Sequence, residues 1–299
     1  MSDYHQSVLL KESIDGLKLK AGGVYVDVTY GGGGHSLEIL KQIGKEGKLF
    51  AFDQDEDAKR NKLDDERLIL IQQNYRFLKN YLRFYGVEKV DGVLADLGVS
   101  SYQFDEAGKG FSLRFEGPLD MRMSKNNELT AYKVLNEYEK EELVRVLKDY
   151  GEVKNAKKLA DEIIKKREGG GLKTTSDLVG VADKCLIGKR NKYLAQVFQA
   201  IRIEVNDELN ALKEMLEQTK EVLKTGGRVV VITYHSLEDR LVKNFFKTGN
   251  FEGVMKQDFY GNKLVDFKLI NKKPILPTEE EITKNSRARS AKLRIAEKI

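Results

Sequence analysis

Short apolar runs alternate with helical patterns through the first hundred residues. Nearly continuous apolar runs predict strands over residues 24–28, 49–52, 68–71 and 92–95. Helical spacing follows over residues 37–43, after Asp53, and over residues 77–86, where Gly86 is expected to end the helix. Apolar strands that alternate with helices are typical of a parallel sheet covered on both faces. This part of the chain therefore predicts an α/β fold.

The pattern changes after the fourth predicted strand. From about residue 104 to residue 197, apolar residues recur at helical spacing and no convincing buried strand is predicted. A long helix over residues 209–223, expected to end at Gly226 and Gly227, then precedes a core strand over residues 229–233. Weaker strand candidates cover residues 251–259 and 265–270. We therefore predict one α/β domain in two parts, residues 1–104 and 201–299, with a helical domain of residues 105–200 inserted between them.

Composition narrows the class of protein. Of the 299 residues, 40% are hydrophobic and 33% are charged, which is typical of a soluble globular protein with a charged surface. No apolar run approaches membrane-spanning length, and residues 1–5 lack the pattern of a secretory signal, so a cytoplasmic location is expected. The single cysteine, Cys185, is expected to be buried. One cysteine and three histidines make neither a disulfide framework nor a Cys/His zinc site, and no metal is expected.

The excess positive charge lies near the carboxyl end of the sequence. From Lys268 onward there are nine Lys and Arg residues and four Asp and Glu residues, a net charge of +5 that equals that of the whole chain. Such a segment, and residues 284–298 in particular, is either a patch that contacts RNA phosphates or an ordinary solvated terminus.

Candidate chemistry begins with the glycine run at residues 31–34, directly after the first predicted strand. Glycines let the backbone pass close to a ligand, although an isolated run is also compatible with a flexible turn. The dinucleotide fingerprint fits poorly, because Ser36 stands where its third small residue belongs. Asp53, 19 residues after Gly34, ends the second strand, where an acid accepts hydrogen bonds from both hydroxyls of a ribose.

Two further acids near these strand ends need separate interpretations. Asp55 precedes a helical pattern and is expected to cap it, a role that is also the alternative for Asp53. Asp96 ends the fourth strand, and the carboxyl ends of parallel strands meet at one edge of the sheet. NAD and S-adenosylmethionine both satisfy this arrangement.

Six motifs, in order along the chain, resemble those of one known family. They are YGGGGHS at residues 30–36, DLGVSS at 96–101, GPLDMRM at 117–123, FQAIRIEVN at 198–206, YHSLEDR at 234–240 and SRARS at 286–290. Together they resemble the small-subunit ribosomal RNA methyltransferase H family, also called the MraW family. The resemblance implies a class I S-adenosylmethionine-dependent methyltransferase with a Rossmann-like sheet and an inserted helical domain. It further implies methylation of the N4 exocyclic amine of a cytidine in the decoding region of 16S rRNA, with the small ribosomal subunit as partner.

The same resemblance implies a set of cofactor-binding residues for S-adenosylmethionine. They are Gly33, Gly34, His35, Asp53, Tyr75, Asp96 and Gln103. The resemblance assigns no catalytic residue, although Asp96 is also a candidate for orienting the cytosine amine. The sequence departs from the family at three positions: Gly32 stands for a frequent Arg, Tyr102 for a common Pro, and Tyr234 for Phe.

A second set of residues is expected to bind the RNA substrate. It comprises Asp120, Arg122, His235, Arg287 and Arg289. For Asp120 and Arg122 the alternative is an ion pair that fixes their loop, and for His235 it is a structural hydrogen bond. Arg202 lies in a helix of alternating charge, where a salt bridge is favoured over RNA contact.

Two other functions remain as alternatives at this point. A nicotinamide-dependent oxidoreductase would use a similar sheet, although Ser36 argues against it. A ribosome-assembly factor that binds RNA without catalysis would not need the intact Asp53 or the run Gly33, Gly34 and His35.

Overall fold

The computed structural model describes residues 7–99, 103–104, 106–113 and 115–299. The polar start at residues 1–5, and Ser100, Ser101 and Tyr102 of the fourth-strand motif, lie outside the described residues. The chain divides into two compact units. The sheet unit comprises Met1–Gly98 and Leu209–Ile299, and the helical unit comprises Val99–Glu208. The domain boundaries expected from the sequence, at residues 105 and 200, both lie within the helical unit.

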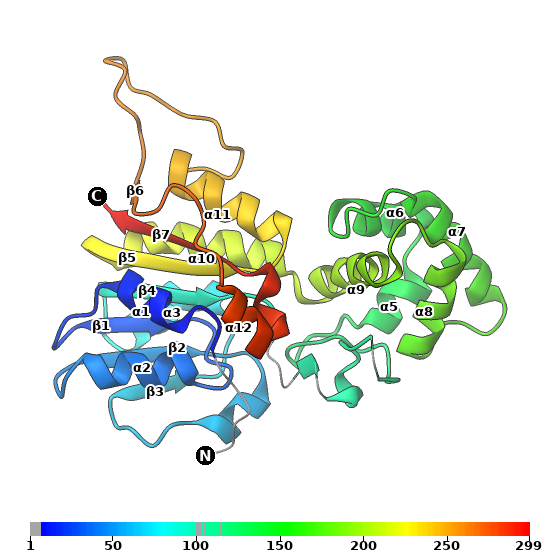
Figure 1. Cartoon of the computed structure of the whole chain (residues 1–299), viewed down its shortest axis with the longest axis horizontal. Helices are drawn as coiled ribbons and strands as arrows, with labels where there is room; N and C mark the ends of the chain where they lie inside the picture. Colours follow the sequence, from blue (N-terminus) through cyan, green and yellow to red (C-terminus); the bar gives the residue numbers. More distant parts are fainter. Residues whose placement is uncertain (1–6, 100–102, 105, 114) are drawn as a thin grey trace. The chain divides into compact units, whose positions relative to one another are not determined.

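The sheet unit is built on a seven-stranded sheet (Figure 1). Five strands are parallel, in the spatial order β3 (Leu68–Ile71), β2 (Lys48–Phe52), β1 (Val24–Asp27), β4 (Val90–Asp96) and β5 (Leu223–Thr233). Two antiparallel strands complete it, β7 (Lys292–Lys298) beside β5 and β6 (Phe267–Leu269) at the edge. The predicted α/β fold is confirmed.

Helices cover both faces of this sheet because successive side chains of each strand point to opposite faces. Val26 and Phe50 pack with one set of helices: α3 (Leu78–Phe84), α10 (Glu208–Val222) and α11 (Ser236–Thr248). Tyr25 and Leu49 pack on the other face with α1 (Leu10–Leu17) and α2 (Gly34–Gln42). These strand residues are at most 1% exposed, which explains why the strands read as continuous apolar runs.

Short helices occupy several connections of the sheet unit. The segment after Asp53 forms only a 3-10 helix, η1 (Glu56–Asn61), capped as expected by Asp55, whose carboxylate accepts the amide of Asp57 at 3.1 Å. The others are η2 (Tyr75–Phe77), α12 (Glu279–Lys284) and η4 (Ser286–Ser290).

The helical unit packs its helices around a core of its own. After the short η3 (Ala107–Lys109), these helices are α5 (Ala131–Glu137), α6 (Lys140–Asp149), α7 (Ala156–Glu168), α8 (Thr175–Lys184) and α9 (Arg190–Asn206). Cys185 is a free thiol, 2% exposed, as expected.

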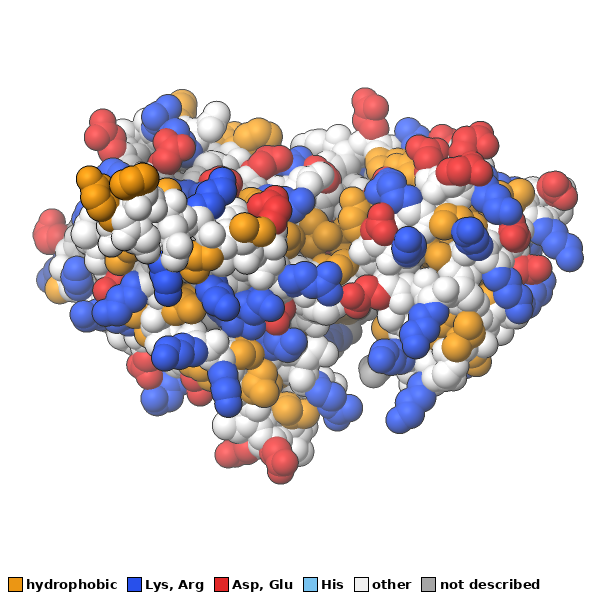
Figure 2. Space-filling model, turned by 90° about the horizontal axis from the view of Figure 1, so that it is seen from above, with side chains coloured by type: hydrophobic (Ala, Val, Ile, Leu, Met, Phe, Trp, Pro, Cys, Tyr) orange, Lys and Arg blue, Asp and Glu red, His pale blue; other side chains and the backbone are white. Residues whose placement is uncertain are grey.

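Charged side chains of both signs cover much of the surface visible in Figure 2, with smaller hydrophobic areas between them. Within the described part of the chain, no helix is both long enough and apolar enough to span a membrane.

Two expectations from the sequence are wrong: the end of one helix, and a strand over residues 251–259. The helix that begins at Glu208 ends at Val222, because Leu223 already pairs with Val90 as part of β5. Gly226, with φ 78°, instead forms an irregularity within this strand. Residues 251–259 form no strand, because Phe251 stacks on Phe245 with ring centroids 5.1 Å apart and the chain then turns back in an exposed hairpin.

A third correction concerns the basic segment near the carboxyl end. Residues 292–298 do not form a solvated terminus: they form β7, inserted between β5 and β6, and the expected contact of this segment with RNA phosphates stays a prediction. Arg294, 7% exposed, donates to Asp239 at 2.7 Å, and Lys298 pairs with Asp266 at 3.3 Å. Part of the local charge excess is therefore neutralised within the fold.

The Arg294–Asp239 ion pair gives the first prediction. Replacing Arg294 with Met leaves a largely buried carboxylate with only the longer contact from Lys292 at 3.5 Å, and we expect a loss of about 2 kcal/mol in unfolding free energy, measured by urea denaturation at neutral pH. Burial alone would raise the pKa of Asp239, but the hydrogen bond and charge of Arg294 outweigh it and lower the pKa. The contribution of the pair is thus present above about pH 4 and lost as the pH falls through the lowered pKa.

The control for this variant is Lys11→Met, which removes an exposed pair with Asp15. It should cost much less than Arg294→Met, because solvent screens an exposed ion pair. An equal cost for the two variants would contradict the assignment of Arg294 to the interior of the sheet.

Candidate active site at the carboxyl edge of the sheet

Four polar residues stand where neighbouring parallel strands end. Asp27 ends β1, Asp53 follows β2, Asp96 ends β4 and Tyr234 follows β5. Since these strands are adjacent and parallel, their carboxyl ends share one edge of the sheet. Chain order reverses beside β1, and ligands of open α/β sheets bind at such a position.

The glycine run forms a tight turn at this edge. The amide of Tyr30 donates to the carbonyl of Phe52 at 2.8 Å, which ties the turn to the end of β2. Gly33 has φ 77°, and a Cβ atom there would lie 2.8 Å from the hydroxyl of Tyr30. A Cβ atom on Gly34 would lie 2.1 Å from Oγ of Ser7. Gly33 is therefore favoured by its backbone angle and by the Tyr30 ring, whereas a side chain at Gly34 would require the hydroxyl of Ser7 to turn away.

Asp27, which the sequence analysis did not single out, anchors this turn. It is 1% exposed and accepts hydrogen bonds from the amide of Thr29 at 3.1 Å and the hydroxyl of Ser36 at 2.7 Å. Burial raises the pKa of Asp27. The carboxylate joins the end of β1 to the first turn of α2 and so fixes both ends of the glycine turn. Its position at a strand end, nine residues before a serine in the first turn of the next helix, was the available signal.

The carboxylate oxygens of Asp53 can accept hydrogen bonds from the hydroxyls of a ribose. Its Oδ2 accepts the amide of Gly31 and its Oδ1 the amide of Asp55, each at 2.8 Å. Each carboxylate oxygen can accept a further hydrogen bond, so the pair fits a vicinal diol. Burial raises the pKa of Asp53 to about 6, which shows that the ionised group is poorly solvated. The residues present therefore fit an adenosine-bearing cofactor.

His35 lies in the first turn of α2 with its ring turned into the protein. It is 5% exposed, and its Nε2 lies 3.1 Å from the carbonyl oxygen of Val8. Because a carbonyl only accepts, Nε2 carries the hydrogen, and Nδ1 faces Asp96 at 3.8 Å. The His35 ring therefore makes its contacts within the protein. Any contact of this turn with a cofactor would be made by its backbone N–H groups.

Asp96 is held by a tyrosine from the neighbouring strand. The hydroxyl of Tyr234 donates to its Oδ1 at 2.7 Å, and the backbone amide of Asp96 donates to Oγ1 of Thr29 at 2.6 Å. Burial raises the pKa of Asp96 to about 6, while the charge of His35 and the hydrogen bond from Tyr234 oppose the rise. The pKa of Tyr234 is itself raised well above its usual value by burial and by Asp96, so the hydroxyl keeps its proton and donates.

Tyr75 joins the same edge from β3. It begins η2, directly after this strand, and its ring is partly buried against the core. The amide group of Asn74 donates to Gln54 at 2.9 Å, which holds this turn beside the residue that follows Asp53. Six of the seven residues expected to bind the cofactor therefore lie at the carboxyl edge of the sheet unit. The seventh, Gln103, is buried in the helical unit.

His235 forms the N-terminal cap of α11. Its Nδ1 accepts the amide of Glu238 at 3.4 Å, and its Nε2 lies 3.1 Å from Oε1 of the same residue. Glu238 in turn accepts the amide of Tyr234 at 2.9 Å. The structural alternative for His235 is thus present in the fold, while its role toward substrate stays a prediction.

Arg287 and Arg289 lie at the same edge of the sheet because of the way β7 pairs with β5. Thr233 at the end of β5 pairs with Lys292 at the start of β7, so the residues just before Lys292 lie beside the carboxyl ends of the parallel strands. Both arginines belong to η4 and are exposed, while Ala288 between them is buried in the core. Figure 1 shows α12 and the segment after it at this end of the sheet.

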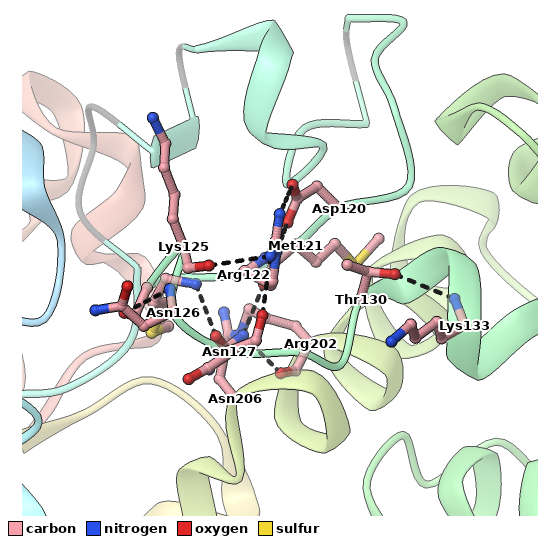
Figure 3. A network of polar contacts seen from close by, with 12 residues as sticks. Asp120, Met121, Arg122, Lys125, Asn126, Asn127, Thr130, Lys133, Arg202 and Asn206 are labelled. Atoms are coloured by element: carbon pink, nitrogen blue, oxygen red, sulfur yellow. Dashed lines mark hydrogen bonds and ion pairs between the residues drawn. The ribbon is translucent and has the colours of Figure 1, made fainter.

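Asp120 and Arg122 form an ion pair inside the helical unit (Figure 3). Nε and Nη2 of Arg122 donate to the two carboxylate oxygens at 2.7 and 2.9 Å, and Nη1 donates to the carbonyls of Lys125 and Asn127. Burial would raise the pKa of Asp120, but Arg122 outweighs it and lowers the pKa. The loop-fixing alternative is observed, and an RNA contact by this pair stays a prediction.

Asn206, the last residue of the motif FQAIRIEVN at residues 198–206, clamps this loop. Its amide group donates to the carbonyl of Met121 and its Oδ1 accepts the amide of Met123, both at 2.7 Å. Met121 has φ 56°, a strained angle that the clamp stabilises. Arg202 pairs with Glu208 at 2.8 Å, which confirms the predicted salt bridge.

The sheet unit defines an α/β enzyme whose glycine turn and strand-end acid suit an adenosine-bearing cofactor. A profile of the MraW methylase family matches residues 2–299. The chain therefore belongs to the MraW methylase family. This membership confirms the enzyme class, a methyltransferase, and the expected cofactor, S-adenosylmethionine.

Named relatives are similar to this chain over nearly its whole length. The chain is 61% identical to "Ribosomal RNA small subunit methyltransferase H" of Flavobacterium johnsoniae, covering 99% of this chain and 98% of that protein. It is 56% identical to the protein of the same name from Christiangramia forsetii, covering 100% and 99%. Among solved structures, an rRNA methylase from Streptococcus thermophilus aligns with a TM-score of 0.45 at 13% identity, covering 99% of both chains.

The contact between Tyr234 and Asp96 gives the second prediction. Replacing Tyr234 with Phe keeps the ring but removes the hydrogen bond that lowers the pKa of Asp96, so this pKa should rise above about 6. The charged groups His35, Asp27 and Glu238 also act on Asp96 and remain in place. Carbon-13 NMR titration of the Asp carboxyl groups, assigned with Asp96→Asn, measures the change.

Tyr25→Phe is the matched control for this variant. It removes another buried tyrosine hydroxyl, which accepts the amide of Lys20 at 2.8 Å near the start of β1. The titration of Asp96 should stay at its wild-type position in this control. The same titration curve in Tyr234→Phe would refute the proposed effect of the hydroxyl.

Proposed function

We propose that this methylase transfers the methyl group of S-adenosylmethionine to the N4 amine of a cytidine in the decoding region of 16S rRNA. The observation that carries the proposal is the combination of the strand-end site at Asp27, Asp53 and Asp96 with full-length similarity to proteins named as small-subunit ribosomal RNA methyltransferases. The substrate would be the RNA of the small ribosomal subunit, and the reaction would take place in the cytoplasm.

The cofactor-binding role falls to the carboxyl edge of the sheet unit. Asp53 would accept the ribose hydroxyls, the turn at Gly33 and Gly34 would allow close approach of the backbone, and Tyr75 would pack near the adenine. When bound, S-adenosylmethionine supplies an activated methyl group on a good leaving group. The protein then mainly supplies binding and orientation. Gln103 is also proposed as a cofactor-binding residue, on the family resemblance alone.

Asp96 is suited to orient the amine that receives the methyl group. The lone pair of an exocyclic cytosine amine is delocalised into the ring, so alignment and hydrogen bonds to its N–H groups assist the reaction. Oδ1 of Asp96 accepts the hydroxyl of Tyr234 and Oδ2 lies 3.8 Å from Nδ1 of His35, and each carboxylate oxygen has a further lone pair that can accept a hydrogen bond from an amine. A pKa of about 6 keeps most of this carboxyl group ionised at neutral pH.

RNA binding would combine residues from both units. Arg287 and Arg289 offer exposed guanidinium groups at the edge where the reaction is proposed. Asp120, Arg122 and His235 are proposed to act on the RNA as well, and their contacts hold the local backbone in shape in either case. The target base has to leave its stack to reach a methyl donor in such a site.

Methyl transfer and its dependence on Asp53 form the third prediction. The purified protein, supplied with S-adenosylmethionine and small-subunit RNA or assembled subunits, should yield N4-methylcytidine mapped by mass spectrometry. Asp53→Asn should weaken cofactor binding at least about tenfold in calorimetry, because a charged acceptor for a ribose hydroxyl is lost. Wild-type affinity should fall as the pH drops below about 6, where Asp53 becomes protonated.

Asp55→Asn is the control for Asp53→Asn. Asparagine still caps η1, so cofactor affinity should be retained. Absence of N4-methylcytidine with both RNA forms would refute the proposed function, whatever the cofactor affinity.

The position of Arg287 and Arg289 gives the fourth prediction. Replacing both with Gln should lower RNA affinity and reduce the salt dependence of binding, since each lost phosphate contact removes about 0.7 from the slope of log K against log salt. The control is Lys18→Gln with Lys20→Gln, two exposed lysines before β1, at the opposite edge of the sheet. Unchanged affinity and slope in the arginine variant would exclude these residues from the RNA interface.

A further inference from the structure

Three segments of the helical unit meet where α7 begins, α8 ends and α9 begins. The side-chain amide of Asn155, just before α7, donates to the carbonyl of Cys185, just after α8, at 2.7 Å. The hydroxyl of Tyr193, in the first turn of α9, donates to Oδ1 of Asn155 at 3.0 Å. These hydrogen bonds hold the three segments together within one unit.

Six exposed lysines surround this junction, and we call them the lysine patch. They are Lys154, Lys157, Lys158, Lys184, Lys189 and Lys192. Their side chains form no hydrogen bond or ion pair with any residue in the described ranges. Elsewhere in the helical unit, by contrast, Lys140 pairs with Asp161 and Lys166 pairs with Asp177.

Acidic neighbours do not neutralise the patch. Asp183 pairs with Arg190, next to the patch, at 2.7 Å. The two charges cancel, so this pair does not change the net charge of the lysines. Glu162 lies near Cys185, where its charge acts on the thiol together with that of Lys158. The junction therefore keeps a strong excess of positive charge.

Lys184, in the last turn of α8, is favourable there, but helix stability does not account for the lysines at the starts of α7 and α9. The first turns of α7 and α9 contain no acidic residue, and the side chains of Asn155 and Lys189 at the cap positions accept no backbone hydrogen bond. A helix N-terminus carries partial positive charge, so Lys157 and Lys158 in the first turn of α7 are unfavourable there. Mutual repulsion of the lysines adds to this cost. An anionic partner would relieve both.

We infer that the lysine patch of the helical unit binds phosphate groups of the ribosomal RNA substrate. The inference rests on the proposed function for the identity of the RNA. Lysine ammonium groups without acidic partners attract the regularly spaced charges of a phosphate backbone. This attraction does not depend on the base sequence. Exposed Leu186 and Ile187, 39% and 52% exposed, lie between the lysines and offer apolar contact to the sugars or bases of the same strand.

The fifth prediction tests this surface with a triple variant. Lys184→Gln, Lys189→Gln and Lys192→Gln together should reduce the affinity for an RNA fragment that contains the decoding region about tenfold or more. The slope of log K against log salt should fall by about 2, because three phosphate contacts at about 0.7 each are removed. Fluorescence anisotropy at several salt concentrations measures both, and the affinity for S-adenosylmethionine should be unchanged.

The matched control replaces three lysines of the same unit, away from the junction. Lys133, Lys165 and Lys173 lie in α5, near the end of α7 and before α8, and none pairs with a described acid. Changing them to Gln removes the same net charge and should leave the slope within about 0.5 of wild type. An equal loss in both triple variants, or no loss in the patch variant, would overturn the inference.

Two further outcomes are informative. If the patch variant binds the RNA fragment normally but loses affinity for the assembled small subunit, an acidic protein is the partner and the inference is overturned. Failure of the proposed function is a separate result, since wild-type protein would then give no N4-methylcytidine whatever the RNA-binding slopes are.

Discussion

The buried carboxylate of Asp27 is the interaction on which the rest of the site depends. It joins the end of β1 to Thr29 and to Ser36 in α2, and the glycine turn lies between these two attachments. Thr29 also accepts the amide of Asp96, so the same turn sets where β4 ends. One side chain with almost no exposure thus fixes the geometry of the neighbouring strand ends. Burying a carboxylate costs free energy, but the hydrogen bonds that it accepts fix the positions of their donors.

Burial raises the pKa of the neighbouring acids as it does that of Asp27. Asp53 and Asp96 have fewer donors, and burial raises the pKa of each to about 6. Their contribution to stability is present at acidic pH and is lost as the pH rises through about 6, where the ionised forms are poorly solvated. At neutral pH the free protein therefore keeps two under-solvated carboxylates at one edge. Hydroxyl and amine donors of cofactor and substrate would supply the missing hydrogen bonds, which links the instability of the edge to its proposed use.

Much of the sheet and part of the site could be predicted from the sequence, and the exceptions have physical reasons. The strands through Val26, Phe50 and Val93 are buried on both faces, so their apolar runs are unambiguous. Residues 292–298 read as a basic tail, because the acids that pair with Arg294 and Lys298 come from distant segments. The strand-end acids follow from parallel topology, but the partner of Asp96, Tyr234, is 138 residues away and only the folded chain brings them together.

The place of β7 in the sheet constrains the order in which the protein can form during synthesis. β7 lies between β5 and β6, and Thr233 and its β7 partner Lys292 are 59 residues apart. The helical unit is continuous in sequence and has its own core, so it can fold while the ribosome is still making the rest. In the sheet unit, β1 to β4 can pair with one another early, but β4 has to wait for its partner β5, and β5 for β7, which are made much later. An enzyme of ribosomal RNA built this way acquires its complete site only after translation has passed residue 292, which ties the appearance of active protein to the finished chain.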